Sequence, residues 1–149
     1  MRQQRSSQGE QDGLNLHASC VACHGRAALI QGKSGAGKST LALHLLSLGA
    51  DLVSDDRTVL WRGRDGVMAD APEPLRGLIE ARGVGILRAL PAGPTPVALV
   101  IDLDADETER LPERRETQIL GQSVPLLHRV DAPHFAPAIL QYLAHGREA

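Results

Sequence analysis

Residues 32–39 fill every fixed position of the pattern G-x-x-x-x-G-K-[ST], with the sequence Gly32-Lys33-Ser34-Gly35-Ala36-Gly37-Lys38-Ser39. Residues 27–31 before this stretch have the composition of a short buried strand, and residues 40–46 after it have that of a helix. This order predicts a phosphate-binding loop, because its backbone N–H groups and the following helix N-terminus attract an anion. We expect a nucleoside triphosphate as the ligand, with Lys38 at the β- and γ-phosphates and the Ser39 hydroxyl on Mg²⁺. The alternative is a glycine-rich turn that caps a helix and binds nothing.

Length and composition predict one domain. The chain has 149 residues, of which 42% are hydrophobic, enough for a single packed core. Residues 1–13 are polar and are predicted to be a disordered tail before a domain at 14–149. The net charge of −2 and the single Trp, Tyr and Phe argue against a nucleic-acid partner. No run of eighteen apolar residues and no apolar leader is present, which predicts a cytoplasmic protein with no membrane partner.

Two cysteines form the literal pattern C-x-x-C-H at residues 20–24. This pattern also attaches c-type haem, but here it lies eight residues before the phosphate loop in a chain without an export signal. A zinc site would need a second pair of ligands, and cysteines three apart on a strand point to opposite faces, which argues against a disulfide. We therefore expect Cys20 and Cys23 to be small core residues.

The remaining patterns predict an α/β fold with a mixed, mostly β core around the phosphate loop and few helices. The loop helix should end near Leu48, and residues 75–90 contain too many glycines for a long helix. Residues 104–115 are a charged surface stretch, and residues 97–103, the most apolar segment, should form the centre of the sheet. Two strands are expected within residues 14–31, and one each at 51–54, 58–61 and 67–69 and within 116–127. A closing helix is expected at 135–143.

Two acidic positions compete for the role of metal ligand or base. Asp55 and Asp56 follow the strand at 51–54, which we expect beside the strand that leads into the phosphate loop. Asp102 ends the apolar strand at 97–101, like the acid that holds Mg²⁺ in many nucleotide hydrolases. The pattern of residues alone does not choose between them.

Three blocks resemble the catalytic domain of the HPr kinase/phosphorylase family. His17 precedes the loop, Leu52-Val53-Ser54-Asp55-Asp56 follows it at the family's distance, and a third block carries the signature Glu-x-Arg-Gly-x-Gly. That third block is the most specific of the three, and it reads Gly77-Leu78-Ile79-Glu80-Ala81-Arg82-Gly83-Val84-Gly85-Ile86-Leu87. The resemblance implies an ATP-dependent kinase that phosphorylates a serine of HPr or an HPr-like phosphocarrier protein, and a reverse phosphorylase reaction.

The resemblance also assigns roles to single residues. Asp56 would take the proton from the target serine, with Asp55 as its structural partner. Glu80 would join Ser39 on Mg²⁺, and Arg82 would stabilise charge near the phosphates. His17 matches an active-site histidine of the family, and Arg110 looks like its later catalytic arginine.

The sequence departs from the family in three places. It begins a few residues before the catalytic block, like a short proteobacterial form without the amino-terminal domain. Ala81 replaces a β-branched residue, and residues 128–134 lack the Gly-Arg-Asn-type run used for phosphorolysis, which favours the kinase direction. Family members form hexamers, so a homo-oligomer is expected. Two other functions stay open: a small-molecule kinase or nucleotide-gated regulator that uses Asp102, and a non-catalytic nucleotide-binding module.

Overall fold

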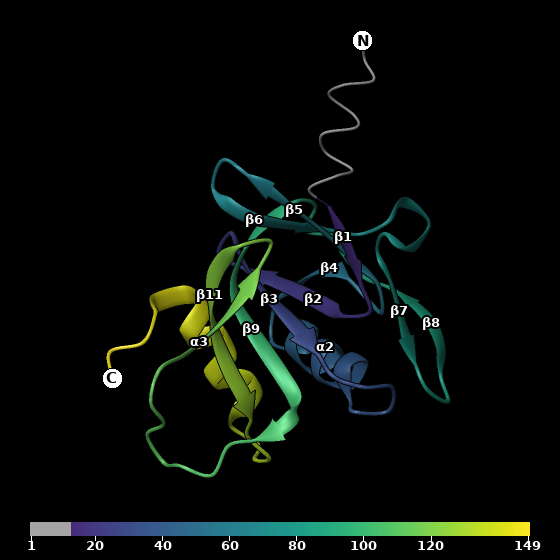
Figure 1. The fold of residues 1–149 in the computed structure, drawn as a ribbon. Helices are drawn as coiled ribbons and strands as arrows, with labels where there is room; N and C mark the ends of the chain where they lie inside the picture. Colours follow the sequence, from purple (N-terminus) through teal and green to yellow (C-terminus); the bar gives the residue numbers. More distant parts are fainter. Residues whose placement is uncertain (1–12) are drawn as a thin grey trace.

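A computed structural model describes residues 13–149. The predicted tail falls, except for Gly13, outside the described residues. The part that is described has a mixed β core with helices packed against it, as the sequence predicts (Figure 1). The elements are β1 Leu14–Leu16, β2 Ser19–Cys23, β3 Arg26–Gln31, α2 Lys38–Ser47, β4 Asp51–Ser54, β5 Thr58–Gly63, β6 Gly66–Asp70, the 3-10 turn η1 Glu73–Leu75, β7 Leu78–Ala81, β8 Gly85–Arg88, β9 Thr95–Asp106, β10 Arg115–Ile119, β11 Gln122–Arg129 and α3 Phe135–His145.

Strand β9 is the centre of the sheet, which confirms the prediction for residues 97–103. It pairs in parallel with β3 on one side and with β11 on the other, and its first residues pair antiparallel with β6. The strand order along the sheet is β1-β5-β6-β9-β3-β2-β4, with β11 on β9 and β10 on β11. Leu99, Val100 and Ile101 are fully buried, as expected for a strand covered on both faces.

The position of β4 corrects one prediction. We expected residues 51–54 beside the strand that leads into the phosphate loop, but β2 lies between them: β2 pairs antiparallel with β3 and with β4. The reason is that the tight turn after Cys23 folds β2 and β3 into a hairpin, and the hairpin occupies the edge of β3. Asp55 therefore follows a strand two positions away from β3.

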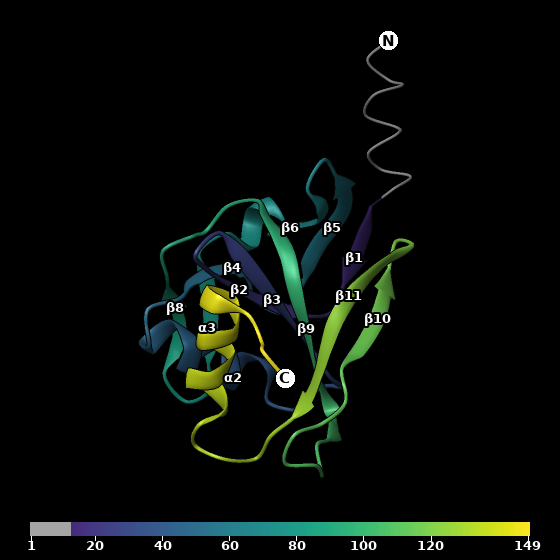
Figure 2. The same ribbon diagram turned by 90° about the vertical axis from the view of Figure 1, so that its left-hand side faces the viewer.

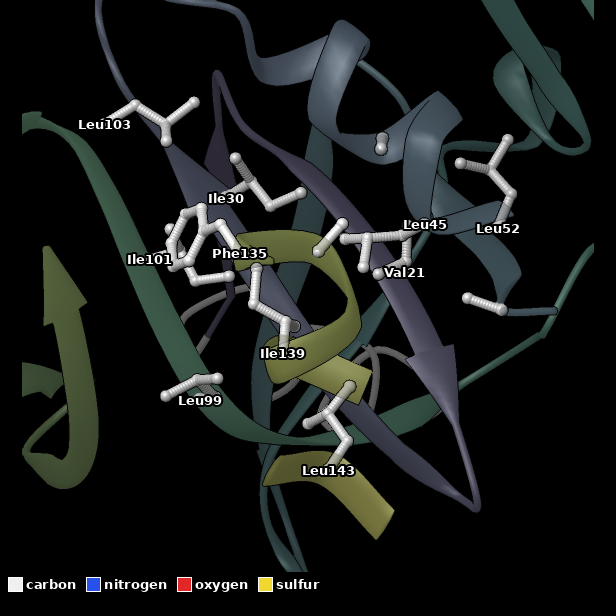
Figure 3. Packing of buried hydrophobic residues seen from close by; sticks show 14 of the residues in the cluster. Val21, Ile30, Leu45, Leu52, Leu99, Ile101, Leu103, Phe135, Ile139 and Leu143 are labelled. Carbon is white, nitrogen blue, oxygen red and sulfur yellow. The ribbon is translucent and has the colours of Figure 1, made fainter. Parts of the chain in front are cut away.

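Two apolar layers cover the two faces of the sheet. Helices α2 and α3 cover one face, where Leu45, Phe135, Ile139 and Leu143 pack on Ile30 and other residues of the strands (Figure 3). Leu140, on the same face of α3, is half-buried and also packs against this layer. On the opposite face, a second cluster joins β2, β3 and β9 to the β5–β6 and β10–β11 hairpins.

The cysteines lie on opposite faces of β2, as their spacing predicts. Cys20 belongs to the second cluster and is fully buried, whereas Cys23 is half-buried and packs against the helix layer. Both are free thiols. Burial raises the pKa of each thiol, and the charge of Asp51 adds to this effect at Cys23. Both are therefore packing residues with little thiolate character.

Local patterns gave the other elements with three exceptions. Residues 14–31 were expected to form two strands but form three, because Leu14–Leu16 is a further strand, β1, that pairs with β5. The hairpin of β5 and β6 is confirmed, and residues 75–90 contain the short hairpin of β7 and β8 rather than a helix. The charged stretch at 104–115 begins inside β9, which continues to Asp106, and residues 116–127 hold most of two paired strands rather than one. Figure 2 shows α3 on one side of the long strands β9 and β11. Between residues 13 and 149, the helices are too short or too polar to cross a membrane.

Candidate active site

A polar hollow of about 270 Å³ lies at the start of α2. It brings together four segments: the β1–β2 connection, the phosphate loop with the first turn of α2, the turn after β4, and the β7–β8 hairpin. We call it the phosphate hollow. Its lining consists of His17, Ser34, Gly35, Gly37, Lys38, Ser39, Thr40, Asp56, Glu80 and Arg82.

The glycines of the loop are required by its shape. A Cβ on Gly32 would lie 2.9 Å from the Ala36 Cβ and 3.2 Å from the Leu103 Cβ, so a side chain there would displace the loop. Gly37, which precedes α2, has a φ of 102°, a conformation that residues with a side chain rarely adopt. Among the described residues no side chain caps α2, so its first N–H groups point toward the hollow as free donors. These features fit the binding of phosphate.

The inner wall of the hollow is a set of buried polar groups joined by hydrogen bonds. Lys38 is buried, and its Nζ donates to the carbonyl oxygens of Gly32 at 2.7 Å and Lys33 at 3.2 Å. Oδ1 of the buried Asp55 accepts hydrogen bonds from the hydroxyls of Ser39 at 2.7 Å and Ser19 at 2.8 Å. The Ser39 hydroxyl is thus held in place by a carboxylate, and both are hard oxygen donors of the kind that Mg²⁺ prefers.

The outer wall is exposed to solvent. Nε2 of His17 lies 2.6 Å from Oδ1 of Asp56, and 54% and 60% of these two side chains are accessible. The backbone of Asp56 has a φ of 69° and its N–H donates to the Ser19 hydroxyl at 3.3 Å. Asp tolerates this left-handed conformation better than most residues. The turn therefore buries Asp55 and directs Asp56 outward into the hollow.

Glu80 and Arg82 come from the β7–β8 hairpin, whose two strands form a separate small sheet. Both side chains are exposed. The hairpin is fixed to the inner wall through its backbone, because the N–H of Glu80 donates to Oδ2 of Asp55 at 3.1 Å. Asp55 therefore connects α2, β2 and the hairpin. A carboxylate and a guanidinium are placed in this way beside the phosphate loop.

The profile of the HPr Serine kinase C-terminal domain matches residues 11–128. The chain belongs to this family. The match spans every element that lines the phosphate hollow, from His17 to Arg82, and it ends one residue before the end of β11.

Individual relatives agree with the profile. The HPr kinase/phosphorylase of Acidovorax sp. (strain JS42) is 38% identical over 131 residues, which cover 78% of this chain and 40% of that protein. The enzyme of the same name from Alkaliphilus metalliredigens is 34% identical over 124 residues, covering 74% and 40%. The solved HPr(Ser) kinase/phosphatase of Coxiella burnetii aligns with a TM-score of 0.71 and 26% identity over 88% of both chains. The chain spans about two fifths of the length of these two curated relatives.

Two residues singled out in the sequence lie away from the phosphate hollow. Arg110 is exposed on the β9–β10 connection and lines another hollow of about 260 Å³, together with Glu107 and His128. The backbone N–H of Glu109 donates a hydrogen bond to the Glu107 carboxylate and holds its pKa below its usual range. Arg115 and the backbone N–H of Thr108 add to this effect. Asp102 does not line the phosphate hollow. Its Oδ1 accepts a hydrogen bond from the N–H of Asp104, in the same strand β9, at 2.9 Å.

Sequence reasoning missed three residues around the loop. Ser19 contacts both Asp55 and the backbone of Asp56, and its only signal in the sequence was a hydroxyl residue at the start of an apolar strand. Both carboxylate oxygens of Asp104 accept from the Lys33 N–H at 3.1 Å, which fixes the beginning of the loop to β9. Thr40 lines the hollow beside Ser39, one position beyond the motif.

Proposed function

We propose that this chain is the catalytic domain of an ATP-dependent serine kinase that acts on HPr or an HPr-like phosphocarrier protein. One observation carries the proposal: the exposed carboxylate of Asp56 lies in the same hollow as the phosphate loop, Lys38 and Ser39. The names of the relatives, which are HPr kinase/phosphorylases, support the choice of acceptor. We also propose the cytoplasm as its location and a homo-oligomer, a hexamer by resemblance to the family, as its assembly.

The transfer step uses groups on both walls of the hollow. The carboxylate of Asp56 accepts the proton of the acceptor serine as the serine oxygen forms a bond to the γ-phosphorus. The bond from that phosphorus to the β–γ bridging oxygen breaks, and ADP leaves. His17 keeps the Asp56 carboxylate oriented through their contact of 2.6 Å. Lys38 turns from the loop carbonyls to the β- and γ-phosphates, where its charge stabilises the transferred group.

The donor set fits Mg²⁺. Ser39 and Glu80 both line the hollow and would hold the ion, which supplies positive charge against the phosphate oxygens when bound. No group of three or more His, Cys, Asp or Glu residues in the range 13–149 is arranged as a complete metal site. Phosphate oxygens and water would therefore complete the coordination, as is usual for Mg²⁺.

Two arginines are assigned to the stabilisation of charge. Arg82 already lines the phosphate hollow, where its guanidinium would stabilise charge on the phosphates of a bound nucleotide. Arg110 keeps its predicted role only if the connection between β9 and β10 moves toward the hollow or if a second copy supplies it. Asp102 is engaged with the backbone of its own strand, so the structure offers no support for a kinase that uses it for the metal.

Replacement of Asp56 by Asn tests the proposal. We expect phosphorylation of a serine in HPr to fall by about 10³-fold, because a general base contributes about 10²–10⁴ to such a step. ATP affinity should change by less than about threefold, since the phosphate loop is intact. Transfer is measured with labelled ATP and purified HPr, and the modified residue is located by mass spectrometry. Asn is chosen because it also tolerates the left-handed backbone at this position.

The matched control is Asp65→Asn, which removes an exposed carboxylate from the β5–β6 turn, outside the hollow. It should transfer phosphate at the rate of the wild type. If Asp56→Asn also transfers at the wild-type rate, the role of Asp56 is rejected. If the wild type binds ATP but modifies no serine of any phosphocarrier protein, the kinase function itself is rejected.

A further inference from the structure

A second hollow, of about 460 Å³, adjoins the phosphate hollow and shares Gly37 and Thr40 with it. We call it the side hollow. Its walls are the side of α2, the end of β9, the segment 129–133 after β11 and the first turn of α3. Most of the lining side chains are apolar, among them Leu41, Leu103, Val130, Pro133, Phe135 and Ala136. Its far wall, from residue 129 onward, lies beyond the part of the chain that matches the family.

The topology of the sheet explains why a hollow forms here. β3, β9 and β11 are parallel neighbours, so their carboxyl ends reach the same edge of the sheet. Figure 2 shows that β9 and β11 end on the side where the chain turns into α3. Open sheets bind ligands in the crevice beyond the carboxyl ends of parallel strands. The phosphate loop follows β3, and the segment 129–133 follows β11 two strands away, which leaves the side hollow between them.

We propose that the side hollow binds the nucleoside part of the triphosphate whose phosphates lie in the phosphate hollow. This inference rests on the proposed function, because it assumes the same nucleotide. Its volume falls in the range of about 300–1,000 Å³ that is typical of small-molecule sites. Apolar walls suit the faces of a base, while His44 and the exposed pair Arg129 and Asp131 offer polar groups for its edge or for the ribose.

The helix α2 links the two hollows along one of its faces. Thr40 lines both hollows, and His44, four residues later and therefore on the same face, lines only the side hollow. A nucleotide laid along this face would place its phosphates at the helix N-terminus and its base beside His44. The catalytic groups lie at the opposite end, because Asp56 and Arg82 line only the phosphate hollow. The acceptor serine therefore approaches from the Asp56 side, and the side hollow is left for the nucleoside.

Comparison of ATP with tripolyphosphate tests this assignment by calorimetry in the presence of Mg²⁺. Tripolyphosphate fills the phosphate hollow alone, so we expect the wild type to bind ATP more tightly. Ala132 is half-buried and lines the side hollow, so Ala132→Trp places an indole where the nucleotide base is proposed to bind. ATP affinity should fall at least about tenfold, and tripolyphosphate affinity should stay within about twofold. Equal affinity of the wild type for both compounds, or an equal loss of both in the variant, would overturn the proposal.

The control variant is Ala138→Trp, which places the same indole on the exposed side of α3, away from the side hollow. It should bind both compounds like the wild type. A second measurement uses the unmodified protein, in case Ala132→Trp does not fold. Light-activated 8-azido-ATP should label residues 41–44 or 129–136, and labelling of the β7–β8 hairpin instead would also reject the assignment. Selective ATP binding without any serine phosphorylation would reject the kinase function but leave the side hollow as a nucleoside site.

Discussion

The two walls of the phosphate hollow are built in opposite ways. On the inner wall, Lys38 and Asp55 are buried and each makes hydrogen bonds to at least two groups of the protein. The outer wall carries exposed side chains, and its contact between His17 and Asp56 leaves more than half of each accessible. Fixed groups suit a ligand that always has the same shape, such as a triphosphate. Exposed groups suit a partner that arrives from solution, such as a serine on another protein.

The largest effect should follow from removing the charge of the inner wall. Lys38→Ala is expected to weaken ATP binding by about 100-fold, because a hydrogen bond to a charged group contributes about 1.5–3 kcal/mol. Transfer should become undetectable. Calorimetry with ATP and Mg²⁺ measures the affinity, and labelled ATP measures the transfer. Lys33→Ala is the matched control: the side chain of Lys33 is exposed, and the hydrogen bonds of this residue are made by its backbone N–H and carbonyl groups, which the substitution keeps.

If Lys33→Ala lost as much affinity as Lys38→Ala, the general positive charge of the loop would matter more than the buried ammonium. The assignment of Lys38 to the inner wall would then be wrong. Lys33 and Lys38 are the only lysines of the chain, so no other lysine contributes to the difference between the two variants.

A smaller effect is expected on the outer wall. Arg82→Ala should lower the turnover number by about 100-fold, as does removal of one group that stabilises charge in a transition state. ATP affinity should stay within about threefold, since Arg82 is exposed and, in the proposed site, the phosphates bind to the inner wall. Steady-state kinetics with HPr as acceptor separates the two quantities. A loss confined to ATP affinity would place Arg82 with the inner wall instead.

Arg110→Ala is the companion variant. Because Arg110 lies in a separate hollow, we expect its removal to lower turnover less than that of Arg82. The opposite ranking would show that the β9–β10 connection, or another copy of the chain, closes over the phosphate hollow during transfer.

The sequence predicted the inner wall better than its surroundings. The strand, loop and helix around Lys38 follow from local patterns, because the conformation of each residue there depends on its neighbours in the chain. Placement of β4 two strands from β3 was not predictable in this way, because the order of strands depends on which edges pair in space. Ser19 was missed for the same reason: its contact with Asp55 spans 36 residues of sequence.

On the outer wall, resemblance to the family supplied what patterns could not. The spacing of Glu80 and Arg82 matches no general motif outside the signature of the family. The structure brings them to the loop through one backbone hydrogen bond, from the Glu80 N–H to Asp55. Arg110 shows the limit of this approach, since the same resemblance points to a residue that lies outside the hollow.

The smallest expected effect is a difference in folding stability between variants of the adjacent residues Asp55 and Asp56. Asp55→Ala should lower the free energy of unfolding by about 1–3 kcal/mol, because it leaves the hydroxyls of Ser19 and Ser39 and the N–H of Glu80 without their acceptor. Asp56→Asn should change it by less than about 0.5 kcal/mol, as is usual for exposed positions. Urea denaturation of both variants measures the difference. Equal stabilities would mean that water replaces the Asp55 carboxylate without cost, and the inner wall would then be no more rigid than the outer one.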